Sequence, residues 1–169
     1  MNARKLRRIA EAAVYLGIAL YLTWRLLVGV RIHAESLRPP APTLRLADGT
    51  SWPLFAARNA YTVLDFGASW CPPCRLEEPL IASFSHRHPE LRLRFVDEQE
   101  SASTALHFAA SYGLETPALD DGALASRLGV NGFPTVIVLR RDGSVAAQFT
   151  GFDPGIELAL LPYAKDKAR

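Results

Sequence analysis

The chain contains little sulfur, with only two cysteines and one methionine in 169 residues. A zinc finger needs four ligands at set spacings, but there is no second cysteine pair, and His86 and His88 stand too close together for that pattern. Covalent haem attachment needs a histidine directly after the second cysteine, where this chain has Arg75. The cysteine content therefore disfavours a zinc site and excludes covalent haem, and no metal or organic cofactor is indicated.

The sequence also lacks internal repeats, low-complexity tracts and a basic stripe with interleaved aromatic residues. Residues 1–38 hold seven Lys or Arg and two Asp or Glu, a net charge of +5, whereas the remainder holds twelve basic and fifteen acidic residues. The positive charge of the chain therefore belongs to its N-terminal segment. Because the larger part is slightly acidic, we expect no nucleic-acid binding.

The two cysteines that are present, Cys71 and Cys74, are separated by two residues and follow the apolar run 61–66. A strand that delivers such a pair to the start of a helix is typical of a redox site. Unpaired N–H groups and the helix dipole favour an anionic sulfur there, so we expect Cys71 to be the attacking thiolate. A purely structural disulfide across so short a loop would add little stability.

Two prolines, Pro72 and Pro73, lie between the cysteines. Proline suits the first turn of a helix, so these residues predict a sharp helix start directly after Cys71. They also remove two N–H donors that could stabilise the thiolate, which limits how far the pKa of Cys71 can fall. We therefore expect a moderate to reducing active site.

The N-terminal segment combines basic residues with an apolar stretch from 9 to 32 whose uncharged core is 12–24. About 22 helical residues span ~33 Å, enough to cross a bilayer core of ~30 Å. Basic residues before such a helix place the N-terminus in the cytoplasm. The basic residues are Arg4, Lys5, Arg7 and Arg8.

A cleaved signal peptide is the alternative, because the short apolar core also fits an h-region and Ala34-Glu35-Ser36 is a weak cleavage site. Both interpretations export the rest of the chain, most simply to a bacterial periplasm. The predicted organisation is a cytoplasmic segment (1–8), an inner-membrane anchor (9–32), a proline-rich linker (33–42) and one domain (43–169).

The pattern of the exported part predicts strands joined by helices, an α/β arrangement with a mixed sheet and helices on both faces. Asp48-Gly49 and the segment 141–144 have turn chemistry and predict two hairpins. The expected strands are 43–46, 50–54, 61–66, 91–96, 135–139 and 145–149, and the expected helices are 74–86, 103–112, 123–128 and 155–164, the last interrupted at Pro162.

Two motifs at this distance from each other carry a family resemblance. The first is Asp65-Phe66-Gly67-Ala68-Ser69-Trp70-Cys71-Pro72-Pro73-Cys74-Arg75, followed by Glu77 and Pro79, and the second is Gly132-Phe133-Pro134-Thr135. Over residues 41–162 the chain resembles the thioredoxin superfamily, most closely its membrane-anchored branch of TlpA, ResA and CcmG-like proteins. The resemblance implies a thioredoxin-like fold and a thiol:disulfide oxidoreductase.

The resemblance also implies that Phe133-Pro134 is a cis bond facing Cys71. The loop would pair with an extended substrate, with Trp70, Pro72 and Pro73 also in the substrate-binding surface. Relatives usually carry an aromatic residue where this chain has Gly67, so we expect open space beside the active site there.

Two carboxylates complete the predicted site. Asp65 matches the buried aspartate that assists proton transfer at the second cysteine in thioredoxins, although an exposed strand-end carboxylate is the alternative. Glu77 matches an acidic residue thought to tune cysteine ionisation or substrate contact in the anchored branch. Its alternative role is that of a plain first-turn dipole stabiliser, which Glu78 could equally fill.

The expected function is disulfide reduction by the Cys71-Cys74 dithiol, with re-reduction by a membrane electron conduit of the DsbD or CcdA type. Apocytochrome c cysteines or a copper site awaiting assembly are the implied clients. An oxidase or isomerase, and a peptide-binding module without catalysis, remain as alternatives.

Overall fold

The computed structural model describes residues 14–17, 37, 42–55 and 60–165. The chain divides into two compact units, residues 1–31 and 32–169. In the first unit, the described residues 14–17 are helical. Within the described ranges, no helix has the length and apolar character needed to cross a membrane. The predicted anchor (9–32) and linker (33–42) fall almost entirely outside these ranges.

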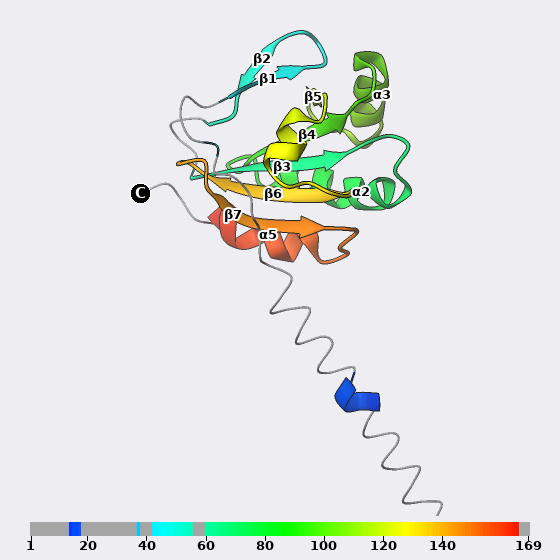
Figure 1. Ribbon diagram of the computed structural model, residues 1–169, viewed down its shortest axis with the longest axis vertical. Coiled ribbons are helices and arrows are strands. Elements are labelled where there is room, and N and C mark those ends of the chain that lie inside the picture. The colour runs from blue at the N-terminus through cyan, green and yellow to red at the C-terminus, as the bar shows by residue number, and fades with distance from the viewer. Residues whose placement is uncertain (1–13, 18–36, 38–41, 56–59, 166–169) are drawn as a thin grey trace, which may run out of the picture. The chain divides into compact units, whose positions relative to one another are not determined.

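The second unit is built on one seven-stranded sheet with the strand order β2-β1-β5-β4-β3-β6-β7 (Figure 1). Strands β3, β4 and β5 run parallel to one another, and the other neighbours pair antiparallel, so the sheet is mixed as predicted. The strands are β1 (Thr43–Leu46), β2 (Ser51–Pro53), β3 (Tyr61–Gly67), β4 (Arg92–Glu98), β5 (Ala118–Asp120), β6 (Thr135–Arg140) and β7 (Val145–Thr150).

Strand β3 lies in the middle of the domain, between β4 on one side and β6 on the other. Six of its seven residues are buried, which is why its sequence is a nearly continuous apolar run rather than an alternating one. Alternation along the strand points Leu64 and Phe66 to one face of the sheet and Val63 and Asp65 to the opposite face. The carboxyl end of this strand leads directly to the cysteines.

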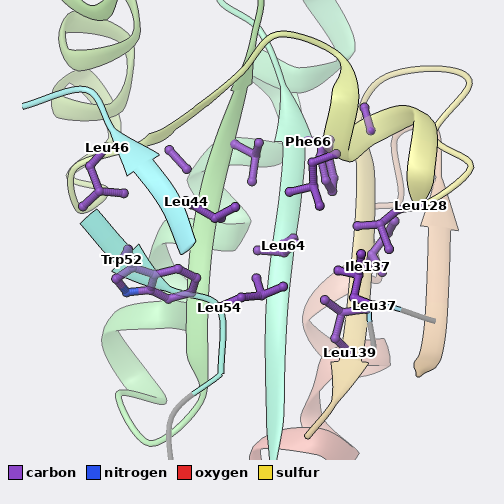
Figure 2. Close-up of a cluster of buried hydrophobic side chains, with 14 residues drawn as sticks. Leu37, Leu44, Leu46, Trp52, Leu54, Leu64, Phe66, Leu128, Ile137 and Leu139 are labelled. Carbon is purple, nitrogen blue, oxygen red and sulfur yellow. The ribbon is translucent and has the colours of Figure 1, made fainter. Parts of the chain in front are cut away.

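Helices cover both faces of the sheet (Figure 1). On one face, α4 and residues of β1 and β2 pack against Leu64 and Phe66 (Figure 2). On the other face, α2 and α5 pack against Val63, and Phe108 of α3 meets Phe95 of β4 with ring centroids 5.5 Å apart. The helices are α2 (Pro72–Arg87), α3 (Ala102–Tyr112), α4 (Ala123–Arg127) and α5 (Ile156–Lys165).

The ends of the helices follow their capping residues. Helix α3 begins one residue earlier than predicted because Ser101 accepts a hydrogen bond from the backbone N–H of Thr104, 3.2 Å away. It ends at Gly113, whose φ of 73° is the left-handed conformation that glycine adopts at little cost. Helix α2 likewise begins at Pro72, before the predicted Cys74.

Two features differ from the predictions. Strand β5 was not predicted, because three residues are too few to show an alternating pattern, and it forms by pairing with β1 and β4. The interruption predicted at Pro162 is wrong, since α5 continues to Lys165. Leu158, whose carbonyl would have bonded to the missing N–H, belongs to the exposed side of the helix, where water can replace the lost bond.

The position of β3 generates a stability prediction. Leu64 is fully buried at the centre of the sheet, so Leu64→Ala leaves a cavity and we expect it to lower the free energy of unfolding by about 2–5 kcal/mol. Denaturant unfolding of the oxidised protein measures the change. Leu158→Ala, at a side chain that is 76% exposed, is the control and should stay within about 0.5 kcal/mol. Equal effects of the two changes would contradict this assignment of the core.

Candidate active site

The cysteines lie where β3 gives way to α2. Cys71 and Cys74 form a disulfide with an S–S distance of 2.08 Å and a Cα–Cα distance of 5.3 Å. Cys71 retains 3% exposure, whereas Cys74 has none. Cys71 is therefore the sulfur nearer to solvent, as expected for the cysteine that meets a substrate first.

Cys71 is also the N-cap of α2, and its Sγ accepts a hydrogen bond from the backbone N–H of Cys74 at 3.2 Å. Pro72 and Pro73 occupy the first two helical positions and have no N–H to offer. For the described part of the chain, this is the only hydrogen bond to the Cys71 sulfur. The helix start is sharp, as predicted, but few donors reach the sulfur.

The loop before Cys71 is fixed by a residue that the sequence did not single out. Glu100 accepts hydrogen bonds from the Ser69 backbone N–H and the Ser69 hydroxyl, both at 2.6 Å. Arg75 donates to the Ser69 carbonyl at 2.7 Å, and Asp97 accepts from the Glu100 N–H at 3.2 Å. Burial opposes ionisation of Glu100, but the Ser69 bonds outweigh it and lower its pKa.

The predicted substrate-binding residues lie at the surface and just beneath it. Trp70 is 61% exposed and meets the half-buried Phe133 edge-on, with ring centroids 5.9 Å apart. Phe133-Pro134 is a cis peptide bond, as the resemblance implied. Pro134 is buried, Pro72 is exposed and Pro73 is half-buried. An aromatic pair thus joins the second motif to the loop that carries Cys71.

Asp65 is only 1% exposed and lies on the face of the sheet that α2 covers. The expected burial is confirmed, and the alternative of an exposed strand-end carboxylate is wrong. Burial raises the pKa of Asp65, the nearby Glu77 charge raises it further, and the interaction with the Glu78 side chain acts in the opposite direction. The pKa of Asp65 is therefore raised to about 8, so this carboxyl can take up or release a proton close to neutral pH.

Glu77 and Glu78 lie beyond the first turn of α2 and are 2% and 1% exposed. The alternative of first-turn dipole stabilisers is therefore wrong for both. Glu77 accepts a hydrogen bond from the backbone N–H of Asp153 at 2.7 Å, and burial raises its pKa to about 7. Burial also raises the pKa of Glu78, with the Asp65 and Glu77 charges adding to the effect.

Gly67 does not leave open space, so that expectation is wrong. A Cβ at Gly67 would lie 3.0 Å from Cε2 of Phe95 and 3.3 Å from Sγ of Cys74. Phe95 is 2% exposed, and its ring occupies the volume next to the cysteine. A Cβ fits between the two only if one of them moves by a few tenths of an ångström.

Comparison with known proteins agrees with this site. A thioredoxin-like domain matches residues 54–164, and the chain belongs to the thioredoxin-like family. It is an enzyme of the thiol:disulfide oxidoreductase class, in which the Cys71-Cys74 disulfide takes the place of a bound cofactor. Where residues are described, no group of three or more His, Cys, Asp or Glu is arranged to hold a metal ion.

Several curated relatives are similar to this chain. The thioredoxin-like protein YneN of Bacillus subtilis is 27% identical over 78% of this chain and 79% of its own length. ResA of Bacillus thuringiensis is 30% identical over 52% of this chain, and a DsbE homologue of Paracoccus denitrificans is 32% identical over 53%. The chain spans about half the length of the latter two, at 53% and 50%.

Solved structures share the fold. A Chlorobium tepidum protein of the DsbE thiol:disulfide interchange type has a TM-score of 0.64 at 28% identity, covering 76% of this chain and 94% of that chain. A secreted Mycobacterium tuberculosis disulfide oxidoreductase has a TM-score of 0.61 at 21% identity, covering 73% and 94%. The thioredoxin-like fold is thereby confirmed.

The close contacts at Gly67 generate a prediction. In Gly67→Ala the new methyl group must displace either Phe95 or Cys74, so we expect the free energy of unfolding to fall by about 1–3 kcal/mol. The shift of Cys74 should also slow closure of the disulfide. Denaturant unfolding and thiol titration measure the two effects. Gly132→Ala is the control, because its φ is not positive and a Cβ there would meet only Cγ2 of Thr150 at 4.0 Å. A fully stable Gly67→Ala protein would contradict the packing described.

The buried carboxyls generate a pH dependence. Glu77 has an ordinary pKa of 4.5 and a folded pKa of about 7, so the native state holds a proton that the unfolded chain releases. Stability is therefore fully present below pH 4.5 and falls as pH rises to about 7, by at most about 1.4 kcal/mol per pH unit for one group. The pKa of Glu100 is lowered, so its contribution to stability is lost only as pH falls below this range.

Denaturant midpoints of the oxidised protein at pH 5 and pH 7.5 test this dependence. We expect the higher midpoint at pH 5. Glu77→Gln keeps an oxygen to accept the Asp153 N–H bond, and it should reduce the difference without abolishing it, because other buried carboxyls contribute. A midpoint that rises from pH 5 to pH 7.5 would show that Glu77 is ionised in the native state.

Proposed function

We propose that the protein is a membrane-anchored disulfide reductase that acts through the Cys71-Cys74 dithiol on the outer side of a bacterial inner membrane. The relatives ResA and the DsbE homologue bear the names of a thiol-disulfide oxidoreductase and a thiol:disulfide interchange protein. The direction of the reaction rests on the surroundings of the two sulfurs.

The observation that carries this proposal is how little stabilises the reduced, anionic form. Cys71 Sγ accepts one backbone N–H bond, from Cys74, because Pro72 and Pro73 have no N–H. The buried residues Asp65 and Glu77 are acids, so neither can supply the positive charge that would stabilise a thiolate. A poorly stabilised reduced form corresponds to a low, reducing potential.

The proposed reaction has two exchanges. The Cys71 thiolate attacks a substrate disulfide, forming a mixed disulfide and releasing the first substrate thiolate. Cys74 then loses its proton to Asp65, directly or through one water, and attacks Cys71. The second substrate thiolate leaves, so the substrate is reduced by two electrons and Cys71-Cys74 is oxidised. Glu77 tunes the ionisation of the cysteines by its charge.

Substrate binding involves the surface around the more accessible sulfur. Trp70 and Phe133 offer an exposed aromatic pair, and Pro72 borders the same loop. An extended chain could pair with the backbone next to Pro134, where no N–H of that residue competes for the thiolate. We infer that the substrate is an extended segment of a protein rather than a small disulfide.

The location and partners follow from the sequence. The basic residues 4–8 and the apolar stretch 9–32 support an uncleaved anchor with a cytoplasmic N-terminus, and the linker 33–42 supports a separate exported domain. In an oxidising compartment a reductase needs a partner that returns it to the dithiol, of the DsbD or CcdA type. Cytochrome c maturation or metal-site assembly would supply its clients.

Two other functions would use the same motif. A disulfide oxidase or isomerase would need a strongly stabilised Cys71 thiolate. A peptide-binding module without catalysis would retain full function after both cysteines are changed to serine. Such a module would give the Cys71-Cys74 pair no role.

The reduction potential of the full-length protein tests the proposal, with the dithiol and disulfide equilibrated against glutathione or dithiothreitol buffers. We expect a value at or below about −200 mV. A value near about −120 mV would make the disulfide a donor and replace our proposal with the oxidase. Cys71→Ser, which cannot form the disulfide, is the control that assigns the titration to this pair.

A further inference from the structure

Glu78 is the buried carboxyl that the proposed chemistry leaves unexplained. It is 1% exposed, and its Oε2 has no hydrogen-bond partner within the described chain. In a helix, residues four apart share a face, and side chains lean towards the N-terminus. Glu78 therefore leans towards Cys74, on the buried side of α2 that also carries Ile81.

Asp65 reaches the same place from the sheet. It shares a face of β3 with Gly67, and Cys74 Sγ rests 3.3 Å from where a Gly67 Cβ would be. Its neighbours in register are Phe95 on β4 and Val136 on β6, neither of which can donate a side-chain hydrogen bond. Both carboxylate oxygens lack an N–H or hydroxyl donor from the described residues.

Asp65 and Glu78 nevertheless act on each other, because the charge of Asp65 raises the pKa of Glu78. Two ionised carboxylates only accept hydrogen bonds, so a bond between them requires a proton on one. Burying two adjacent negative charges without a cation is also far more costly than burying one. Asp65 is the member of the pair that shares a face of β3 with Gly67, next to Cys74 Sγ, so we assign the acceptor role to Asp65 and the proton to Glu78.

We propose that Glu78 is a positioning residue for Asp65: as a neutral carboxylic acid it donates a hydrogen bond to the Asp65 carboxylate and keeps it able to accept the Cys74 proton. The inference rests on the proposed dithiol chemistry. The Cys74 S–H bond breaks, an O–H bond forms on Asp65, and the Cys74 thiolate attacks Cys71. The proton later leaves Asp65 for water, and Glu78 keeps its own proton throughout.

The groups that face this pair are acids and thiols. Within the described structure, the charges that act on Asp65 and Glu78 are each other and Glu77, and no lysine, arginine or histidine acts on either carboxyl. Among the groups that act on Asp65, Glu78 is the one that we propose as the donor. The ionisable groups next to this pair are Glu77 and Cys74 of α2. Asp153 acts on Glu77 from the segment before α5.

The test resolves the reaction steps of Cys71 and Cys74 in time. The reduced full-length protein is mixed with dithionitrobenzoate under single-turnover conditions. Cys71 releases the first aryl thiolate by forming a mixed disulfide, and Cys74 releases the second when it closes the protein disulfide. The rate of the second release is measured from pH 5 to pH 9. In wild type it should rise with pH through the ionisation of Asp65.

In Glu78→Leu the donor is lost, so Asp65 holds its proton more tightly. We expect the midpoint of the second release to move up by about one pH unit or more and its rate at pH 7 to fall about tenfold, with recovery at high pH. The first release should be unchanged. Glu78→Gln retains an N–H donor of similar reach and should restore the wild-type midpoint. A leucine is similar in volume to a glutamic acid, so the buried position stays filled in this variant.

Two further variants make the assignment specific. Asp65→Asn should slow the second release, and adding Glu78→Leu to it should produce no further change, because Glu78 acts through Asp65. Glu98→Leu removes another buried carboxyl, one that interacts with Asp120 rather than with Asp65, and should leave the midpoint in place.

Several outcomes would overturn the inference. An unchanged midpoint in Glu78→Leu, or an equal loss of rate at every pH, would assign Glu78 a packing role. A further loss in the double variant would show that Glu78 acts by another route. Failure of wild type to release the second aryl thiolate at all would instead contradict the proposed dithiol function.

Discussion

The rest of the structure depends on the burial of β3 between two strands and beneath helices on both faces. Because six of its seven residues are buried, a polar group on this strand is costly unless it is satisfied: Thr62 donates to the Leu54 carbonyl, whereas both Asp65 oxygens lack a partner among the described residues. Asp65 is the ionisable residue in its centre, and the strand ends at Gly67, against Cys74. The same constraint that stabilises the domain therefore fixes the reacting sulfur over a carboxyl that water cannot solvate.

The active site has two sides with different chemistry. Towards the surface, Trp70 and Phe133 present aromatic rings next to the accessible sulfur of Cys71. Towards the interior lie three buried carboxyls, Asp65, Glu77 and Glu78. This division suits a two-step exchange, in which the first sulfur needs access to a partner and the second needs a proton acceptor.

Local signals predicted most of the fold. The apolar run of β3, the prolines after Cys71 and the Asp48-Gly49 turn each act over a few residues, so their elements could be identified from the sequence. Strand β5 could not, because its pairing partners supply the order that its three residues lack. The resemblance correctly implied the cis bond at Pro134 and the burial of Asp65, which composition alone would not have shown.

The parts of the site that the sequence did not predict are contacts across the fold. Glu100 lies 31 residues from Ser69 and Asp153 lies 76 from Glu77, so no periodicity links them. Glu78 was misjudged for a different reason. A Glu-Glu pair near a helix start normally faces solvent, and only the position of α2 over β3 shows that both side chains point inward.

The contact between Glu100 and Ser69 has a consequence for protein engineering. The loop that carries Trp70 and Cys71 is shaped by a carboxylate from the segment between β4 and α3, and the space beside Cys74 is shaped by Phe95. Grafting the six residues from Ser69 to Cys74 onto another thioredoxin-like scaffold would transfer the two sulfurs without the groups that orient them. A transplant that keeps this chemistry has to include the ends of two neighbouring strands as well as the motif.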